Sequence, residues 1–472
     1  MDGFQILPFE FRRFPDDSVL LVNECGDYVF VQASEFDSLH QKRFDAIPLE
    51  VLHRLESRHF ITTGEHRETA IVLCANKYRS RREYLHSSTA LHMLVVTLRC
   101  NHRCEYCQVS SAEEDAYKYD MPPHVAERVV DLAFQSPSPN IKLEFQGGDA
   151  LLNWPTVMAA VRHAEDLNKT AKRMLEFVAC TNLYALTDAH LRDMKEHRIM
   201  LSVSLDGPKA LHDKHRCLRT DGSSYDMFVG NLARARNALG EDCASALMTT
   251  TSDSLDNVEA IVDEYVGLGF PGVFLRALNP YGDAYRNRLY YSPEAFVRMY
   301  KRGLEHILSL NKRGIRFREY YTGLLLHRIL TPYPTGFVDL QSPSGAGVSG
   351  VIYDYTGDVY PADEARMLAR MGNGMFKMGN IFQDDYKKIF LSDVLKRIVR
   401  ESCVETIPGC ATCAYRTYCG VDVFRNYLET GDIANVRSDG FFCRKQTLVF
   451  DYLFERLKDP DFVSTVSSWI GG

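Results

Sequence analysis

Three cysteines in one short segment have the spacing of a metal centre. Cys100, Cys104 and Cys107 follow one another as C-x3-C-x2-C. Three thiolates can each bind one iron of a cubic [4Fe–4S] cluster, which leaves the fourth iron without a protein ligand and open to chemistry. A zinc site or a run of buried cysteines is the alternative, but zinc sites more often assemble from two separated ligand pairs. The spacing therefore favours an iron–sulfur cluster with an open iron.

A second group of cysteines lies near the end of the chain. Cys410, Cys413 and Cys419 form the pattern C-x2-C-x5-C, and Cys443 follows at a distance. Four thiolates can complete a [4Fe–4S] cluster or a structural zinc site. The cysteines alone leave both possibilities open.

The composition indicates an ordinary globular protein. Its 472 residues predict two or three domains, with 45% hydrophobic and 25% charged residues. A net charge of −7 argues against nucleic acid as a partner. The thirteen cysteines are odd in number and no signal sequence begins the chain, so we expect a reducing cytoplasm. No apolar run approaches the ~20 residues that span a bilayer, and membrane association is not expected.

The central region predicts alternating strands and helices. Strand-forming runs occupy residues 94–98, 141–145, 175–179, 200–205, 244–249 and 272–276. Helical patterns lie between them, for example at 122–135 and 257–268. This alternation favours a parallel sheet or a barrel of β/α units.

Polar motifs follow the predicted strands. They are Cys100, Cys104 and Cys107 after the first strand, Gly147, Gly148 and Asp149 after the second, Thr181 and Asn182 after the third, and Ser204 and Asp206 at the fourth. Active sites of β/α barrels are built at the carboxyl ends of the strands. The positions of these residues therefore predict one catalytic face.

The N-terminal region predicts a small module. Strand patterns at 19–23 and 28–31 flank a turn, and helical patterns follow at 33–41 and 48–58. An exposed edge of such a sheet could accept a peptide as an added strand, and a stabilising cap is the alternative role. We expect residues 77–82 to be a solvated linker and the Gly/Ser-rich residues 342–350 to be a mobile loop over the substrate.

The first cysteine motif and its flanks resemble the radical SAM superfamily. The resemblance implies a partial (β/α)6 barrel whose open iron binds S-adenosylmethionine. Gly147-Gly148-Asp149 is similar to the Gly-Gly-Glu motif that grips the amino group of this cofactor, although Asp is one methylene shorter. We expect the glycines to let the backbone approach the ligand closely. The residues expected to contact the cofactor are Tyr106, Gly147, Gly148, Asp149, Thr181, Asn182, Ser204, Asp206, Arg216 and Arg276.

The C-terminal cysteines then resemble a SPASM domain, which carries auxiliary clusters. Typical SPASM domains hold two clusters, but the cysteines of one are replaced here by Ser344, Ala362 and Val423. The resemblance thus implies one auxiliary [4Fe–4S] cluster, held by Cys410, Cys413, Cys419 and Cys443. Asp363 occupies the position of a general base in some relatives, and Glu364 could share its role.

The chain as a whole is similar to the His-Xaa-Ser system radical SAM maturases. This implies a winged-helix-like peptide-recognition module with a linker at residues 1–85 and a radical SAM partial barrel at 86–290. Connecting helices and a loop follow at 291–345, and a SPASM-like domain at 346–472. The implied partners are a ribosomally made precursor peptide bound through its leader, a flavodoxin- or ferredoxin-type electron donor, and a second radical SAM maturase.

The resemblance also implies a reaction. A 5′-deoxyadenosyl radical would abstract hydrogen from the peptide, and an intramolecular C–C crosslink of cyclophane type would form to an aromatic side chain. Other oxidative changes are alternatives: dehydrogenation, conversion of an alcohol to a carbonyl, or a C–O crosslink. A protein of a different class, a non-catalytic iron–sulfur peptide binder or redox sensor, also fits the residues.

Overall fold

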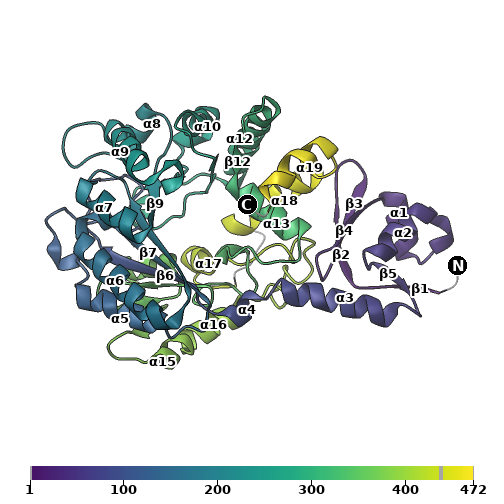
Figure 1. The fold of residues 1–472 in the computed structure, drawn as a ribbon. Helices are drawn as coiled ribbons and strands as arrows, with labels where there is room; N and C mark the ends of the chain where they lie inside the picture. Colours follow the sequence, from purple (N-terminus) through teal and green to yellow (C-terminus); the bar gives the residue numbers. More distant parts are fainter. Residues whose placement is uncertain (1–2, 435–439, 471–472) are drawn as a thin grey trace.

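The computed structural model describes residues 3–434 and 440–470. Its centre is an eight-stranded sheet in the order β10-β9-β8-β7-β6-β13-β14-β15 (Figure 1). Five neighbouring parallel strands form the barrel wall: β6 (Leu91–Thr97), β7 (Asn140–Gly147), β8 (Met174–Thr181), β9 (Ile199–Ser204) and β10 (Ala244–Leu247). The sixth predicted strand, β11 (Gly272–Val273), pairs with β12 (Arg318–Glu319) and is joined to the segment after β10 by a single bridge between Thr250 and Ala277. The predicted α/β partial barrel is confirmed.

The two faces of the barrel wall differ. In β7, Ile141, Leu143 and Phe145 are fully buried in a core shared with α5 (Pro123–Ala133) and α6 (Trp154–Ala171). The alternate residues Lys142 and Glu144 are only half-buried. Because side chains alternate across a strand, the helices cover one face of β7 and its polar side chains lie on the other face. The face of β7 opposite the helices is therefore polar and partly accessible.

Helices surround this wall (Figure 1). Those of the barrel and its connections are α7 (Asp188–His197), α8 (Lys209–His215), α9 (Ser224–Leu239), α10 (Val258–Gly267), α11 (Gly282–Arg286), α12 (Pro293–Lys312) and α13 (Tyr320–Leu330). In the part of the chain that is described, no helix is long and apolar enough to cross a membrane.

The predicted N-terminal hairpin and helices are present. Strands β2 (Phe9–Arg13), β3 (Ser18–Asn23) and β4 (Tyr28–Gln32) form an antiparallel sheet, followed by α1 (Ala33–His40) and α2 (Leu49–Ser57). A second ladder pairs β1 (Phe4–Ile6) with β5 (Ile61–Thr63). One face of the three-stranded sheet packs against α1 and α2, and the other packs against Phe454 of the C-terminal helix α18 (Phe441–Arg456).

Two segments predicted to be exposed are instead packed. Helix α3 (Arg67–Ser80) replaces most of the expected linker, and Arg81 is 4% exposed, donating a hydrogen bond to the carbonyl of Cys25. The expected mobile loop at 342–350 is mostly buried, and the backbone N–H of Ser344 donates to the hydroxyl of Ser402. Charge and Gly/Ser content suggested solvent, but tertiary partners satisfy these polar groups.

The segment after residue 345 completes the sheet. Strand β13 (Gly350–Tyr353) runs parallel to β6, and β14 (Asp358–Tyr360) and β15 (Gly379–Asn380) continue antiparallel. Its helices, with the short helix that precedes the barrel, are α4 (Tyr84–Ser87), α14 (Asp363–Arg370), α15 (Tyr386–Phe390), α16 (Asp393–Glu401), α17 (Val423–Thr430) and α19 (Pro460–Val466). The barrel sheet therefore runs across the predicted domain boundary.

The packing of α18 against the N-terminal sheet predicts a stability effect. Phe454 is fully buried, with its ring centroid 5.2 Å from Tyr28 and 5.6 Å from Tyr418. Phe454→Ala should lower the free energy of unfolding by about 3–5 kcal/mol. Chemical denaturation and limited proteolysis would measure this loss. The control is Phe382→Ala, at a ring that is 55% exposed. Equal effects of the two substitutions would contradict the packing role of Phe454.

Candidate active site

The three cysteines of the first motif lie on the loop that follows β6. The backbone N–H groups of His102 and Ser111 point at the sulfurs of Cys100 and Cys107, each at 3.4 Å. Burial raises the pKa of Cys100, and that of Cys104 to about 12. Hydrogen-bond donors near a buried sulfur stabilise its thiolate form, and a bound iron would stabilise the thiolate further. The residues present therefore fit a thiolate-bound cluster.

Backbone packing holds this loop on the end of the sheet. A Cβ atom added at Gly147 would lie 1.8 Å from the carbonyl oxygen of Thr97, and one at Gly148 would lie 2.2 Å from that of Arg99. Gly147 also has a φ of +142°. We predicted that the two glycines allow close approach of a ligand. The close approach in the structure is made by the backbone of the cysteine loop itself.

The Asp149 carboxylate is satisfied by the protein. It accepts hydrogen bonds from the backbone N–H groups of Leu151 at 3.0 Å and Asn182 at 2.9 Å, and from the Thr181 hydroxyl at 2.9 Å. Burial raises the pKa of Asp149 to about 6, although these hydrogen bonds oppose the rise. The side-chain amide of Asn182 in turn donates to Asn101 at 2.8 Å. Asp149 therefore joins the ends of β7 and β8 beneath the cysteine loop.

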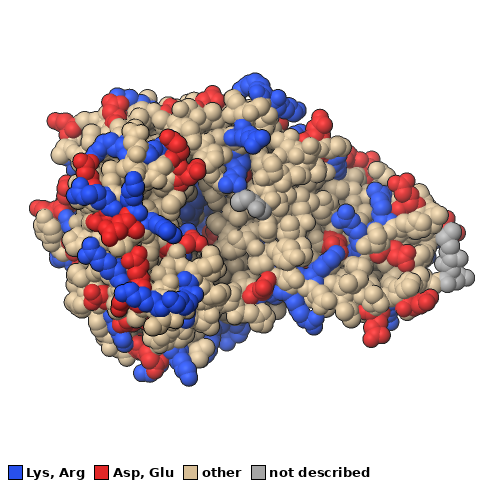
Figure 2. All heavy atoms as spheres, in the orientation of Figure 1, with Lys and Arg blue, Asp and Glu red and all other residues tan. Residues whose placement is uncertain are grey.

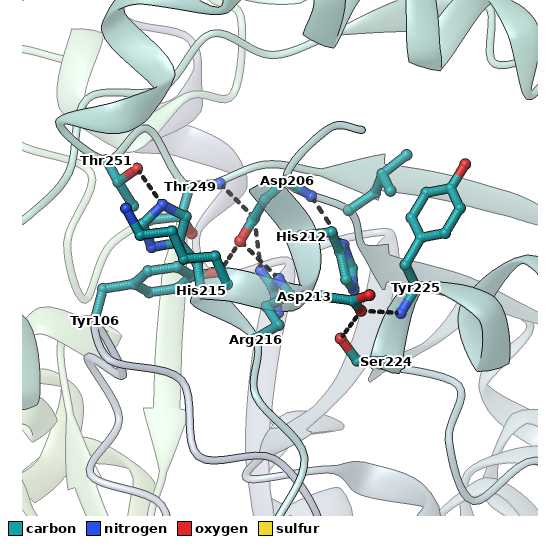
Figure 3. Close-up of polar contacts among 12 residues, drawn as sticks. Tyr106, Asp206, His212, Asp213, His215, Arg216, Ser224, Tyr225, Thr249 and Thr251 are labelled. Carbon is teal, nitrogen blue, oxygen red and sulfur yellow. Dashed lines mark hydrogen bonds and ion pairs between the residues drawn. The ribbon is translucent and has the colours of Figure 1, made fainter. Parts of the chain in front are cut away.

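Asp206 is the centre of a second buried network (Figure 3). Its carboxylate pairs with the guanidinium of Arg216, with Nε 3.0 Å from Oδ2, and accepts a hydrogen bond from the backbone N–H of Thr249 at 3.1 Å. The Tyr106 hydroxyl donates to the same carboxylate. Arg216 was expected to contact the cofactor, and in the structure the planar fork of its guanidinium faces Asp206. Ser204, at the end of β9, is half-buried beside this network.

Arg276 lies in a different group from Arg216. It pairs with Glu364, with Nη2 3.4 Å from Oε1, and the side-chain amide of Asn279 is also 3.4 Å from that oxygen. Burial raises the pKa of Glu364 well above its usual value, and the adjacent Asp363 adds to the rise. The structure thus brings together Arg276 and the two predicted proton acceptors at the start of α14.

One loop connects this group with the cysteine loop. The side chain of Gln108 donates to the carbonyl of Asn279 at 2.7 Å, and the backbone N–H of Asp283 donates to that of Cys107 at 2.8 Å. Figure 2 shows a hollow on the face between the barrel helices and the C-terminal region. The two groups of polar residues are therefore held by one continuous set of contacts.

The structure adds charged residues that the sequence did not single out. Asp339, Asp422 and Lys445 line a small cavity with Arg276. The Lys445 ammonium lies 5.2 Å from the ring centroid of Tyr321. Burial raises the pKa of Asp339 to about 6 and lowers that of Lys445 to about 8. In the sequence, Asp422 and Lys445 lie within three residues of Cys419 and Cys443, respectively.

The second cysteine group also comes together in space. Burial raises the pKa of Cys419, and the nearby thiols of Cys410, Cys413 and Cys443 raise it further. The backbone N–H of Tyr415 points at the Cys413 sulfur at 3.4 Å. Among the described residues, no three Cys, His, Asp or Glu side chains are close enough to hold a single metal ion. A [4Fe–4S] cluster does not require its ligands to meet at one ion, because each thiolate binds a different iron.

The positions that replace the other expected cysteines are buried. Ser344 is 2% exposed, Ala362 is 7% exposed and Val423 is 1% exposed. Ala362 and Val423 belong to a hydrophobic cluster with Ile398 and Val404. Apolar packing thus occupies this region.

Comparison with known proteins defines the class. Residues 94–265 match the family model of the Radical SAM superfamily, so this α/β protein contains a radical SAM domain. Such a domain implies a [4Fe–4S] cluster and S-adenosylmethionine.

Individual relatives narrow the comparison. The chain is 21% identical over 389 residues to the cysteine-type anaerobic sulfatase-maturating enzyme of Clostridium novyi, covering 78% of this chain and 96% of that protein. It is 26% identical over 132 residues to the radical SAM cyclopropyl synthase TigE of Paramaledivibacter caminithermalis, covering 25% of this chain and 27% of that protein. The chain is thus related to radical SAM maturases.

Solved structures share the fold. Native anSMEcpe with bound AdoMet and Kp18Cys peptide has a TM-score of 0.64 at 16% identity, covering 80% of this chain and 99% of that chain. Streptococcus suis SuiB bound to precursor peptide SuiA has a TM-score of 0.56 at 12% identity, covering 92% and 99%. The narrower resemblance to the His-Xaa-Ser system maturases stays a prediction.

The Asp206 network predicts a large effect of removing one partner. Arg216→Met would leave the buried Asp206 carboxylate without its cation, which should cost about 3–5 kcal/mol of stability. The double variant Asp206→Asn with Arg216→Met should recover part of this loss, since it removes both charges. Chemical denaturation of the three proteins measures the difference. Additive losses in the double variant would contradict the pairing.

Proposed function

We propose that this protein is a radical SAM maturase that modifies a ribosomally made precursor peptide. The observation that carries the proposal is that the cysteine loop and the Asp363–Glu364 pair are connected at one end of the barrel. The cysteine loop lies beside the ends of β7, β8 and β9, and the loop containing Asn279 joins it to the Asp363–Glu364 pair. Relatives named as sulfatase-maturating enzymes, aligned over most of the chain, support this function, as does the shared fold with SuiB, which is bound to a precursor peptide.

Each group has a separate task in the proposal. Cys100, Cys104 and Cys107 would hold the cluster, which with S-adenosylmethionine supplies a radical able to abstract hydrogen from an unactivated carbon. Asp149 and Asp206 organise the strand ends beneath that site rather than reacting themselves. The interior of the barrel would place the target carbon and limit access of water.

The product we propose is an intramolecular C–C crosslink of cyclophane type to an aromatic side chain. Forming this bond after hydrogen abstraction requires the substrate to lose one further electron and one proton. We assign the proton to Asp363 or Glu364, two adjacent and partly buried carboxyl groups at the start of α14. The electron would pass to the centre held by Cys410, Cys413, Cys419 and Cys443.

The proposed partners follow from the same scheme. The precursor peptide would bind through its leader to the N-terminal module, where β4 is an edge strand. A flavodoxin- or ferredoxin-type protein would supply electrons, and a second radical SAM maturase would act on the same peptide.

Loss of a cluster ligand provides the first test. Anaerobically reconstituted protein with reductant and S-adenosylmethionine should release 5′-deoxyadenosine, and Cys100→Ala should abolish the release. Liquid chromatography with mass spectrometry measures the nucleoside. Cys243→Ala, at a buried cysteine outside both motifs, is the control and should keep full release. If the wild-type protein releases no 5′-deoxyadenosine, even with a co-expressed peptide encoded beside it, the proposed enzymatic activity is refuted and a binding or sensing protein is favoured.

The proposed proton acceptor predicts a separation of two activities. Asp363→Asn should leave release of 5′-deoxyadenosine within about threefold of wild type while lowering crosslinked product by about 10²–10⁴-fold. Tandem mass spectrometry of the peptide reports the product and locates it. Glu364→Gln tests the neighbour, and Asp393→Asn, at a fully exposed carboxylate, is the control. Unchanged product in both Asp363→Asn and Glu364→Gln would exclude this pair, and a linear product would exclude the crosslink.

A further inference from the structure

A large cavity lies away from the candidate active site. Its volume is about 860 Å³, and none of the predicted cluster, cofactor or proton-transfer residues lines it. Its walls include the β1–β2 loop with Leu7, the β3–β4 turn with Glu24, helix α3 with Ile71, helix α13 with Arg328, and the C-terminal segment with Arg416. Arg416 lies between Cys413 and Cys419, so the cavity borders the second cysteine group.

The lining has an excess of positive charge. Five arginines and two glutamates face the cavity. Both glutamates are already paired, Glu405 with Arg82 and Glu24 with Arg416. The other three arginines have no ion pair with a carboxylate in the described part of the chain. They are Arg67, Arg81 and Arg328.

Arg328 is the most informative of these cations. It is 4% exposed, and its Nη2 donates to the carbonyl of Thr417 at 2.8 Å. Its Nε has no hydrogen-bond partner among the residues described. Arg81 lies beside it, with Nη1 2.6 Å from the Arg328 carbonyl. Burial lowers the pKa of both guanidinium groups, and the Arg81 charge adds to the effect at Arg328.

Among the described residues, neither cation has a carboxylate partner, but Arg81 donates to the carbonyls of Cys25, Gly26 and Arg328. Arg328 is less well compensated, because its buried Nε has no partner among those residues, and a buried charge that has lost water without gaining an opposite charge is costly. A ligand that brings negative charge would relieve this cost, and the planar guanidinium fork matches a carboxylate. Apolar side chains also line the cavity: Ile6, Leu7, Pro8, Ile71 and Ala75. The volume and the mixed lining favour a short amphipathic segment over a small inorganic anion.

We propose that this cavity binds an acidic, partly apolar segment of the precursor peptide. Carboxylates of the segment would contact Arg328 in the interior and Arg67 on the exposed start of α3. This inference rests on the proposed function, since it takes the precursor as the peptide that is bound. It adds a site selective for charge to the backbone pairing that the edge of β4 could offer.

The test is binding of a defined peptide to the full-length protein. The probe is a fluorescein-labelled hexapeptide of alternating leucine and glutamate, compared with the same peptide containing glutamine. Fluorescence anisotropy should show at least tenfold tighter binding of the glutamate peptide. Arg328→Met and Arg67→Gln should each weaken that binding at least tenfold, whereas Arg79→Gln on the same helix, at a residue outside the lining, should not.

The outcomes separate the two proposals. Equal affinity for both peptides, or unchanged affinity in Arg67→Gln, would overturn this inference. Arg67 is exposed, so its variant keeps the test valid even if Arg328→Met fails to fold. Release of 5′-deoxyadenosine without selective binding would refute only the proposed peptide-binding role of the cavity. Selective binding without release of 5′-deoxyadenosine would instead refute the proposed enzymatic function.

Discussion

The close packing of the end of β7 against the loop after β6 is the constraint on which the proposed site depends. Gly147 and Gly148 leave room for the carbonyl groups of Thr97 and Arg99, where any Cβ atom would collide with them. The cysteine loop therefore lies directly on the sheet rather than extending into solvent. Asp149 then fastens the neighbouring strand end through Thr181 and Asn182. Backbone contact and one buried carboxylate thus set where three thiols can meet a cofactor.

The buried carboxylates near the candidate site have different surroundings. Asp206 and Arg216 neutralise each other, and the neighbouring Tyr106 adds a hydrogen bond. A buried ion pair of this kind holds the strand end in position, and its two charges are not available for reaction. Burial, together with neighbouring carboxylates, raises the pKa of Glu364 and Asp339. Groups with displaced pKa values are characteristic of sites where protons move, and Glu364 and Asp339 both lie near Arg276.

Helix α18 connects the distant parts of the molecule. It carries Cys443 of the second cysteine group, Lys445 of the charged cavity and Phe454 beneath the N-terminal sheet. The segment between Cys413 and Cys419 likewise contacts the N-terminal hairpin, since the Tyr418 hydroxyl donates to the carbonyl of Gly26 at 3.0 Å. The N-terminal module is therefore packed onto the cysteine-rich region and is not a separate appendage.

The sequence by itself determined the barrel strands and the N-terminal hairpin, because alternating hydrophobic patterns and turn residues act over a few neighbouring positions. It also identified both cysteine groups, since their spacing is local. Only the tertiary structure decided that Arg216 pairs with Asp206, that Arg276 joins Glu364, and that Arg81 is buried rather than solvated. Each of these depends on residues far apart in the chain, and a charged side chain has no periodicity that reveals its partner. The fold alone brings such charges into contact.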